Sequence, residues 1–378
     1  VLACLQHATN GVPNPRTKSM IPGQKLVRWT KTTNWIQTSN YCKWYGIKCG
    51  KATSDVTEIR LSKNGLTGEF PNEIILLGKT LKTLDLFSNV YHWKGSFDWM
   101  KSMTAMQNLL FGTTAWDSNG IPYQISFMKK LTTIDMSNTF FRGNITEAAF
   151  TDMPKLQYID MGDNSYVTGG KKEFPSSIVR LPSLTRLYMD NVKFTDGGTF
   201  NLNFLASLFK AQEVWMDFTK FSGGLPSEIG KARNLRSLSL TYCGITGTIP
   251  ASMSYTLLDR LWLYGNKLNG TIPSSLASKK WSYLYLEGNS LGGTIPSGIC
   301  KQTAAANSVF ELGADCTICQ KTKNCCSCCG FACNNLFAPT RAPTRAPTRK
   351  QTRVPTAPRK PTRRPTRIPT RAPTIKKN

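Results

Sequence analysis

Short segments of alternating apolar and polar residues recur along the chain at a nearly constant distance. The pattern apolar-x-x-apolar-x-apolar occurs ten times, ending at Leu61, Leu86, Phe111, Met136, Met161, Met189, Met216, Leu240, Leu263 and Leu286. The successive spacings are 25, 25, 25, 25, 28, 27, 24, 23 and 23 residues. Apolar residues two apart share one face of an extended strand, so each segment predicts a short strand. A period of this length indicates a solenoid, because one unit cannot bury its apolar side unless it stacks on its neighbours.

An asparagine follows three residues after the last apolar position in half of the units, at Asn64, Asn89, Asn164, Asn266 and Asn289. Cys243 holds that position in its own unit, where we expect a buried, inert thiol. A buried amide can satisfy the backbone of adjacent turns, so the sequence predicts a ladder of these side chains. Thr114, Thr139, Val192 and Thr219 replace the asparagine in the middle units, where the spacing stretches and where we expect local irregularity.

The second half of several units carries a Gly and a Pro at fixed places. These segments are Leu-Thr-Gly-Glu-Phe-Pro (66–71), Ile-Thr-Gly-Thr-Ile-Pro (245–250), Leu-Asn-Gly-Thr-Ile-Pro (268–273) and Leu-Gly-Gly-Thr-Ile-Pro (291–296). Over roughly residues 25 to 300 the chain resembles the plant-type leucine-rich-repeat family. The resemblance implies an α/β repeat solenoid, a right-handed horseshoe with about ten short parallel strands, one per repeat.

Both ends of the repeats carry cysteines. Trp29, Trp35 and the run 42–49 resemble the N-terminal cap of plant-type repeat ectodomains, which implies a disulfide between Cys42 and Cys49. The eight residues Cys300, Cys316, Cys319, Cys325, Cys326, Cys328, Cys329 and Cys333 resemble the cysteine-rich end caps of some microalgal secreted repeat proteins. We expect structural disulfides here and assign no connectivity. A zinc site at Cys316-x-x-Cys319 is the alternative, which the adjacent cysteine pairs and the lack of a nearby histidine disfavour.

Charge and composition divide the chain into four parts. From Ala338 onward there are 13 Lys and Arg residues and no acidic residue, in Ala-Pro-Thr-Arg repeats, so half of the net charge of +26 lies in a tail. Such a segment has almost nothing apolar to bury and is predicted to be disordered. The expected organisation is an N-terminal cap (1–55), a repeat solenoid (56–299), a cysteine-rich cap (300–337) and a disordered basic tail (338–378).

Twelve cysteines favour an oxidising compartment, and no apolar stretch reaches the length of a membrane helix. We therefore expect an extracellular, cell-surface or cell-wall protein with no transmembrane segment. Asn144 and Asn269 lie in acceptor sequons within the loop half of a repeat, and both are predicted to carry glycan.

Function in a solenoid is expected on the concave strand face. The residues of that face that we single out are Asp85, Asp135, Asp160, Tyr188, Asp190, Trp215, Asp217, Trp262, Tyr264 and Tyr285. They make an acidic first half and an aromatic second half, and exposed tryptophan is uncommon outside binding sites. Facing carboxylates such as those of Asp135 and Asp160 would favour a cationic partner between them. The alternative is a solvated face whose aromatic rings fill the crowded inner side of the curve.

These features favour recognition over catalysis. The predicted function is an extracellular module that binds a peptide or a glycan on its concave face, while the tail attaches to an acidic polysaccharide or a mineral surface. The alternative is a structural cell-wall or adhesion protein in which the solenoid is a spacer and the tail is the working part. We expect no enzyme, no cofactor and no metal site, because only His7 and His92 exist and an open face does not exclude water. The exported context disfavours nucleic acid as a partner.

Overall fold

The structure is a computed structural model that describes residues 2, 5, 29–35, 37–93, 96–116, 120–139, 141–303, 310–321, 325–326 and 328–329. The chain divides into two units, Val1–Thr340 and Arg341–Asn378, and all described residues belong to the first. The predicted tail and Cys333 lie outside the described residues. No helix in the described part of the chain is long and apolar enough to cross a membrane.

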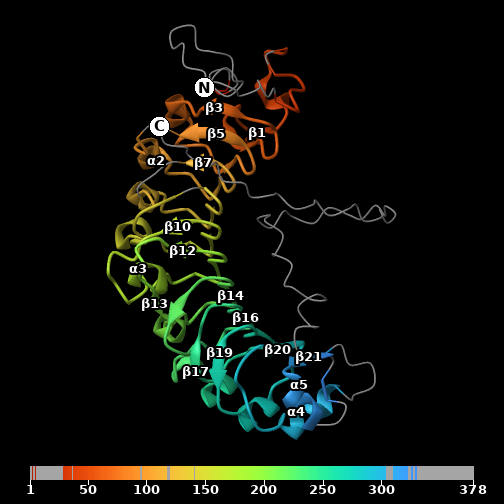
Figure 1. Ribbon diagram of the computed structural model, residues 1–378. Helices are drawn as coiled ribbons and strands as arrows, with labels where there is room; N and C mark the ends of the chain where they lie inside the picture. Colours follow the sequence, from red (N-terminus) through yellow and green to blue (C-terminus); the bar gives the residue numbers. More distant parts are fainter. Residues whose placement is uncertain are drawn as a thin grey trace, which may run out of the picture. The chain divides into compact units, whose positions relative to one another are not determined.

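One parallel sheet runs along the inner side of the solenoid (Figure 1). Its ten repeat strands are β2 (Val56–Arg60), β4 (Thr83–Asp85), β6 (Asn108–Leu110), β8 (Thr133–Asp135), β9 (Tyr158–Asp160), β11 (Arg186–Tyr188), β14 (Glu213–Trp215), β16 (Ser237–Ser239), β18 (Arg260–Trp262) and β20 (Tyr283–Tyr285). These strands pair in parallel in chain order. The leucine-rich-repeat fold and its ten strands are thus confirmed.

Three further strands extend this sheet at its ends. β1 (Ile47–Cys49) pairs antiparallel with β2 in the N-terminal cap. β21 (Glu311–Ala314) and β22 (Cys328–Cys329) continue the parallel order after β20. The cysteine-rich segment therefore adds coils to the solenoid, a continuation that the sequence did not reveal because Gly313 and Ala314 stand where other repeats have large residues.

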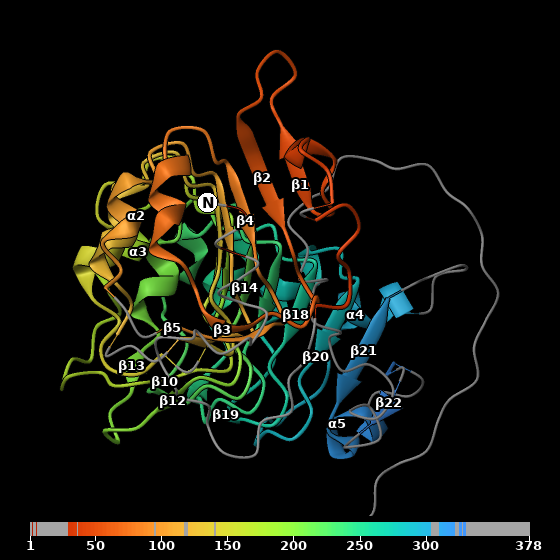
Figure 2. The same ribbon diagram turned by 90° about the horizontal axis from the view of Figure 1, so that it is seen from above.

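A second set of short ladders follows the strands on another side of the stack. It consists of β3 (Thr67–Glu69), β5 (Val90–Trp93) and β7 (Ala115–Trp116), then β10 (Ser165–Tyr166) with β12 (Lys193–Phe194), β13 (Phe200–Asn201) with β15 (Phe221–Ser222), and β17 (Thr246–Thr248) with β19 (Lys267–Asn269). Viewed along the stack, the main sheet, the short ladders and the helices occupy different sides of each coil (Figure 2).

Short helices form the outer side. They are η2 (Asn72–Leu77), α2 (Trp99–Ser102), η3 (Tyr123–Phe127), η4 (Glu147–Phe150), α3 (Ser176–Val179), η5 (Asn203–Ser207), η6 (Ile229–Lys231), η7 (Ala251–Tyr255), η8 (Ser274–Ser278) and α4 (Ser297–Thr303), most of them single 3-10 turns. A proline stands directly before several of them, as Pro250 does before η7 and Pro273 before η8. The proline carbonyl accepts a hydrogen bond from the backbone amide of Met253 in η7 and of Leu276 in η8. The side chains of these two residues are the ones that the helices bury.

The asparagine ladder predicted from the sequence is confirmed. The amide nitrogen of Asn266 donates to the carbonyls of Leu240 and Leu263, 2.7 and 2.9 Å away, and its oxygen accepts from the backbone amides of Cys243 and Ile245. Asn89, Asn164 and Asn289 make equivalent bonds to the backbone of the repeat that precedes each of them. Where threonine replaces asparagine, its hydroxyl still donates to a backbone carbonyl, as Thr219 does to Met189. The repeats with threonine therefore keep part of the ladder, whereas the side chain of Val192 cannot contribute to it.

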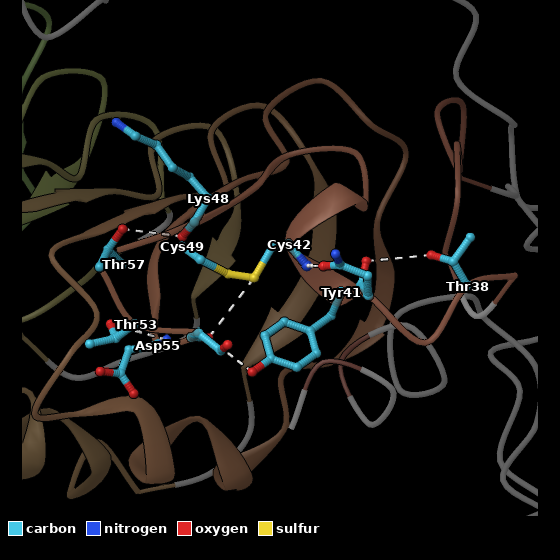
Figure 3. The surroundings of a disulfide bond; sticks show 10 residues. Thr38, Tyr41, Cys42, Lys48, Cys49, Thr53, Asp55 and Thr57 are labelled. Atoms are coloured by element: carbon cyan, nitrogen blue, oxygen red, sulfur yellow. Dashed lines mark hydrogen bonds between the residues drawn. A yellow bond between two sulfur atoms is a disulfide. The ribbon is translucent and has the colours of Figure 1, made fainter. Parts of the chain in front are cut away.

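The N-terminal cap closes the first coil with a disulfide between Cys42, in η1 (Tyr41–Lys43), and Cys49 at the end of β1 (Figure 3). The hydroxyl of Tyr41 donates to the carbonyl of Ser54. Trp29 and Trp35 are buried beside this module, with ring centroids 4.7 Å apart. This is the pair of cysteines that the resemblance implied.

Disulfides also hold the C-terminal segment. Cys300 pairs with Cys325 and Cys319 with Cys326, and Cys316, at the start of α5 (Cys316–Lys321), is disulfide-bonded as well. Sulfur atoms engaged in disulfides cannot act as thiolate ligands. The alternative of a zinc site at Cys316 and Cys319 is therefore wrong.

Candidate binding face

The last residues of the repeat strands form one continuous row on the inner face of the sheet. The strand register places Asp135 beside Asp160, Asp160 beside Tyr188, Tyr188 beside Trp215 and Trp262 beside Tyr285. Successive side chains of a strand point to opposite faces, so this row faces away from the apolar core beneath the sheet. The row contains seven of the ten residues singled out from the sequence. Asp190, Asp217 and Tyr264 lie two residues beyond the ends of their strands.

Most of this row is buried, which corrects the expectation of exposed aromatic rings. Trp215 is 8% exposed, Trp262 6% and Tyr285 2%, while Asp135 and Asp160 are 3% and 2% exposed. Neighbouring side chains on the inner side of a curved sheet converge, so large rings cover one another and the carboxylates between them. Trp262, Tyr264 and Tyr285 form a small apolar cluster separate from the main core. In this part of the face, the structure agrees with the alternative interpretation, in which aromatic rings fill the crowded inner side of the curve.

The acidic residues of the face bind the protein's own backbone. A carboxylate oxygen of Asp135 accepts hydrogen bonds from the backbone amide and the hydroxyl of Ser137, and one of Asp160 accepts from the amide of Gly162. Bonds to the residue two positions later are typical of aspartate at the end of an extended segment. These bonds satisfy one oxygen of each carboxylate within the protein, and a cationic partner at Asp135 and Asp160 stays a prediction.

Two further aspartates link neighbouring repeats. Asp190 accepts from the backbone amide of Asp217 at 2.9 Å, and Asp217 accepts from the hydroxyl of Ser239 and the amide of Thr241. Burial raises the pKa of Asp217, although the bonds from Thr241 and Ser239 act in the opposite direction. These carboxylates stabilise the inner turns.

Aromatic rings from five strands follow one another in the C-terminal part of the face. Tyr158, Tyr188, Trp215, Trp262 and Tyr283 follow one another with centroid distances of 5.3, 5.4, 6.2 and 5.6 Å. The small side chain at position 239, on the strand between the two tryptophans, lets their rings meet across it. Hydrogen bonds fix the polar ends of rings in this region, from the Trp215 indole to Ser237 and from the Tyr188 hydroxyl to Glu213.

Charged side chains accessible to solvent border these rings. Glu213 forms ion pairs with Arg186 at 3.3 Å and with Arg260 at 3.6 Å, and the two arginine side chains are 44% and 33% exposed. Burial is the main cause of the raised pKa of Tyr188, and its bond to Glu213 adds to the rise. The face therefore combines rings held in place with charges that a ligand can reach.

An exposed pair of aromatic rings lies at the other border, where the strands turn toward the ladder asparagines. Phe218 and Tyr242 are 56% and 39% exposed and stack with centroids 5.2 Å apart and planes 14° apart. Their backbones have φ of +57° and +54°, a conformation that bulky residues rarely adopt. The backbone is left-handed at this position in all ten repeats, and the other eight hold Lys63, Ser88, Thr113, Asn138, Asp163, Asn191, Gly265 and Gly288. Sequence reasoning missed this pair, although two aromatic residues at left-handed positions were the available signal.

The C-terminal end of the face buries a further acid. Glu287 is 1% exposed, and neither of its carboxylate oxygens has a hydrogen-bond partner within the described part of the chain. Burial, with a smaller contribution from the charge of Asp315, raises its pKa to about 7. A Cβ at residue 313 would lie 2.6 Å from this carboxylate and 2.5 Å from the ring of Tyr285, so the glycine there makes room for both side chains.

Comparison with known proteins identifies the repeats. The Leucine Rich Repeat family model matches residues 234–255, 257–278 and 280–302. The chain is 28% identical over 251 residues to the "Brassinosteroid LRR receptor kinase BRL3" of Oryza sativa subsp. japonica, covering 66% of this chain. It is 29% identical over 220 residues to the "Receptor-like protein Cf-9 homolog" of Solanum lycopersicum, covering 58% of this chain. Residues 234–302 thus carry leucine-rich repeats, and the chain as a whole is similar to plant leucine-rich-repeat receptors.

The chain spans only 18% of the rice receptor kinase and 22% of the tomato receptor-like protein. Among solved structures, the "Plant peptide hormone receptor RGFR1 in complex with RGF2" matches 72% of this chain and 49% of its own, with a TM-score of 0.57 and 20% identity. This structural match shows the shared solenoid fold.

Proposed function

We propose that this leucine-rich-repeat protein is an extracellular recognition module that binds a peptide on the C-terminal half of its inner face. The contact surface comprises the aromatic row from Tyr158 to Tyr283, the charged border of Arg186, Glu213 and Arg260, and the exposed pair Phe218 and Tyr242. The observation that carries the proposal is this exposed stacked pair, because large solvent-exposed rings are uncommon on a surface that makes no contact.

A peptide fits the chemistry of the face. Flat rings accept apolar side chains, and the alternating charges of Arg186, Glu213 and Arg260 offer partners of both signs. The fold shared with a plant peptide hormone receptor supports a peptide over a glycan as the ligand class. Relatives that are receptor kinases and receptor-like proteins support an extracellular location. Of the residues singled out from the sequence, Tyr188, Trp215, Trp262 and Tyr285 form the floor of the site.

The test uses a library of linear peptides displayed on phage, selected against the full chain and followed by affinity measurement with the enriched peptides. We expect the double substitution Phe218→Asn and Tyr242→Asn to weaken binding at least about tenfold, since each exposed ring contributes roughly 1 kcal/mol. Asparagine favours the left-handed backbone, so these variants keep the fold. Phe209→Asn on the outer side removes an equally exposed ring and should leave affinity unchanged.

Equal loss of affinity in both variants would contradict the assignment of the inner face. Selection of no peptide, together with binding on a glycan array, would replace peptide with carbohydrate as the ligand class.

The basic tail supports a second function, attachment to an acidic matrix. It carries 13 of the chain's 48 Lys and Arg residues without an acidic residue, which favours multivalent and salt-sensitive contacts with a polyanion. Deleting 338–378 should abolish retention on immobilised polygalacturonate at low salt and leave peptide affinity intact. Loss of peptide affinity with unchanged retention would contradict this role for the tail.

A further inference from the structure

The outer helical layer is interrupted at one place, between α3 and η5. Every other pair of successive outer helices packs closely, from η2 with α2 through η8 with α4, whereas α3 and η5 make at most marginal contact. The interruption falls in the two longest repeats, of 28 and 27 residues. The second of these repeats contains two ladder strands instead of one. β12 pairs with β10 of the preceding repeat, and β13 pairs with β15 of the following repeat. The additional residues thus form ladder strands, while α3 and η5 stay as short as the other outer helices.

A cavity of about 650 Å³ opens between these helices. Phe174 and Phe204 form part of its apolar wall, with rings stacked at 4.4 Å, and both side chains are buried. Val179 and Leu181 continue this wall, and Phe209, 58% exposed, stands at the opening. The volume lies within the range of about 300 to 1,000 Å³ that is usual for small-ligand sites.

The rim of the cavity is basic. Arg180 and Lys210 line it, both are exposed, and neither forms an ion pair within the described part of the chain. The one carboxylate at the rim, that of Glu173, already accepts a hydrogen bond of 2.6 Å from the amide of Asn201. Two cations over an apolar wall are complementary to a ligand with an apolar body and a negatively charged head.

The neighbouring repeats show what the outer side looks like without the interruption. Between η6 and η7, in repeats of 24 and 23 residues, the space is only about 200 Å³ and its lining includes Glu228, Lys231 and Arg233. A cavity of that size would not hold the body of an amphiphile. The longer repeats are therefore the feature that creates the larger, apolar space.

We propose that the cavity between α3 and η5 binds a small anionic amphiphile, an organic acid with one carboxylate or sulfonate and an apolar chain or ring. The apolar part contacts Phe174, Phe204 and Phe209, and the acid group pairs with Arg180 and Lys210. This site is on the outer side of the solenoid and is independent of the peptide site proposed for the inner face.

Isothermal titration of the full chain with dodecanoate tests the proposal, with dodecyltrimethylammonium as the probe of the same chain and opposite charge. We expect one dodecanoate per molecule with Kd on the order of 100 µM, and binding of the cationic probe at least about tenfold weaker. The double substitution Arg180→Gln and Lys210→Gln should weaken dodecanoate binding about tenfold and remove the preference for the anion. Lys231→Gln with Arg233→Gln is the matched control and should change neither.

Two further variants test the cavity itself. Ser207→Phe places a ring in the opening and should abolish dodecanoate binding, with circular dichroism as the check of folding. Phe209→Ser changes an exposed ring that the fold does not need, and should weaken binding about fivefold. No saturable binding up to about 2 mM dodecanoate, equal affinity for both probes, or equal effects of the rim and control variants would overturn the proposal.

Discussion

Asn266 links two adjacent turns through four hydrogen bonds to backbone groups that are buried. Replacing it by alanine leaves the carbonyls of Leu240 and Leu263 and two backbone amides without these partners. Because unsatisfied buried polar groups are costly, Asn266→Ala should lower the free energy of unfolding by about 2–4 kcal/mol in urea titrations. Lys267→Ala, at the exposed next residue, should change it by less than about 0.5 kcal/mol. Similar values for both variants would mean that the ladder contributes little.

The buried carboxyl of Glu287 makes stability depend on pH. Its pKa is about 7 in the folded protein, against an ordinary value of 4.5, with burial as the main cause. Between these values the unfolded chain ionises while the folded protein stays protonated, so the folded protein binds more protons and stability falls as pH rises. The total loss amounts to at most about 3 kcal/mol and is complete above the folded pKa.

We therefore expect the wild-type free energy of unfolding to decrease from pH 4.5 to pH 7 by this contribution. Glu287→Gln keeps the shape of the side chain without a titratable group, so the contribution should be absent and the variant should be the more stable protein at pH 8. Urea titrations of both proteins at pH 5 and pH 8 measure the difference. A pH dependence that is identical in the two proteins would show that Glu287 is not its source.

At the level of elements, the features that arise from periodic patterns were predictable from the sequence. The ten strands and the asparagine ladder belong to this group because each depends on residues at fixed spacing within one repeat. The burial of Trp215 and Trp262 could not be predicted, because it depends on how far side chains of neighbouring strands converge on the inner side of the curve. The same limit applies to Asp135 and Asp160, which lie on adjacent strands as expected but are buried and bonded to their own turns. Sequence spacing places residues on a face but does not give the space available to each.

The strands at the C-terminal end of the sheet could not be predicted from the sequence either. β21 keeps the apolar positions Leu312 and Ala314, which are buried, but the latter is small, and β22 consists of two cysteines; both strands pair with the sheet. The disulfide between Cys300 and Cys325, 25 residues apart, connects the helix α4 to the segment just before β22. It thereby helps to hold the two additional strands on the solenoid.

Removal of that disulfide should destabilise the end of the molecule. For Cys300→Ser with Cys325→Ser we expect a loss of about 2–4 kcal/mol in unfolding free energy, since closure of a loop this long restricts the unfolded chain. Hydrogen exchange should increase in β21 and β20 and stay unchanged in β4 and β6. Uniform acceleration through the whole sheet would instead indicate that the solenoid unfolds as a single cooperative unit.

For the whole molecule, each coil presents separate sides with separate chemistry. The inner side carries fixed aromatic rings and accessible charges, the outer side carries the cavity beside α3, and the short ladders lie on a further side (Figure 2). Asn144 bridges to Val167 and Asn269 ends β19, so both acceptor residues belong to the ladder side, and both are exposed. Sugar attached there would leave the inner face and the outer cavity accessible.

We expect both asparagines to carry N-linked glycan when the chain is secreted by a eukaryotic host, because each sequon presents an exposed amide away from the core. Mass spectrometry before and after enzymatic removal of N-glycans should locate sugar at Asn144 and Asn269. The variant Asn144→Gln with Asn269→Gln should lose this mass and keep its affinity for the peptides selected on the inner face. Unmodified asparagine at both positions would contradict the assignment to an exported protein, while loss of peptide affinity in the double variant would place the ladder side within the binding surface.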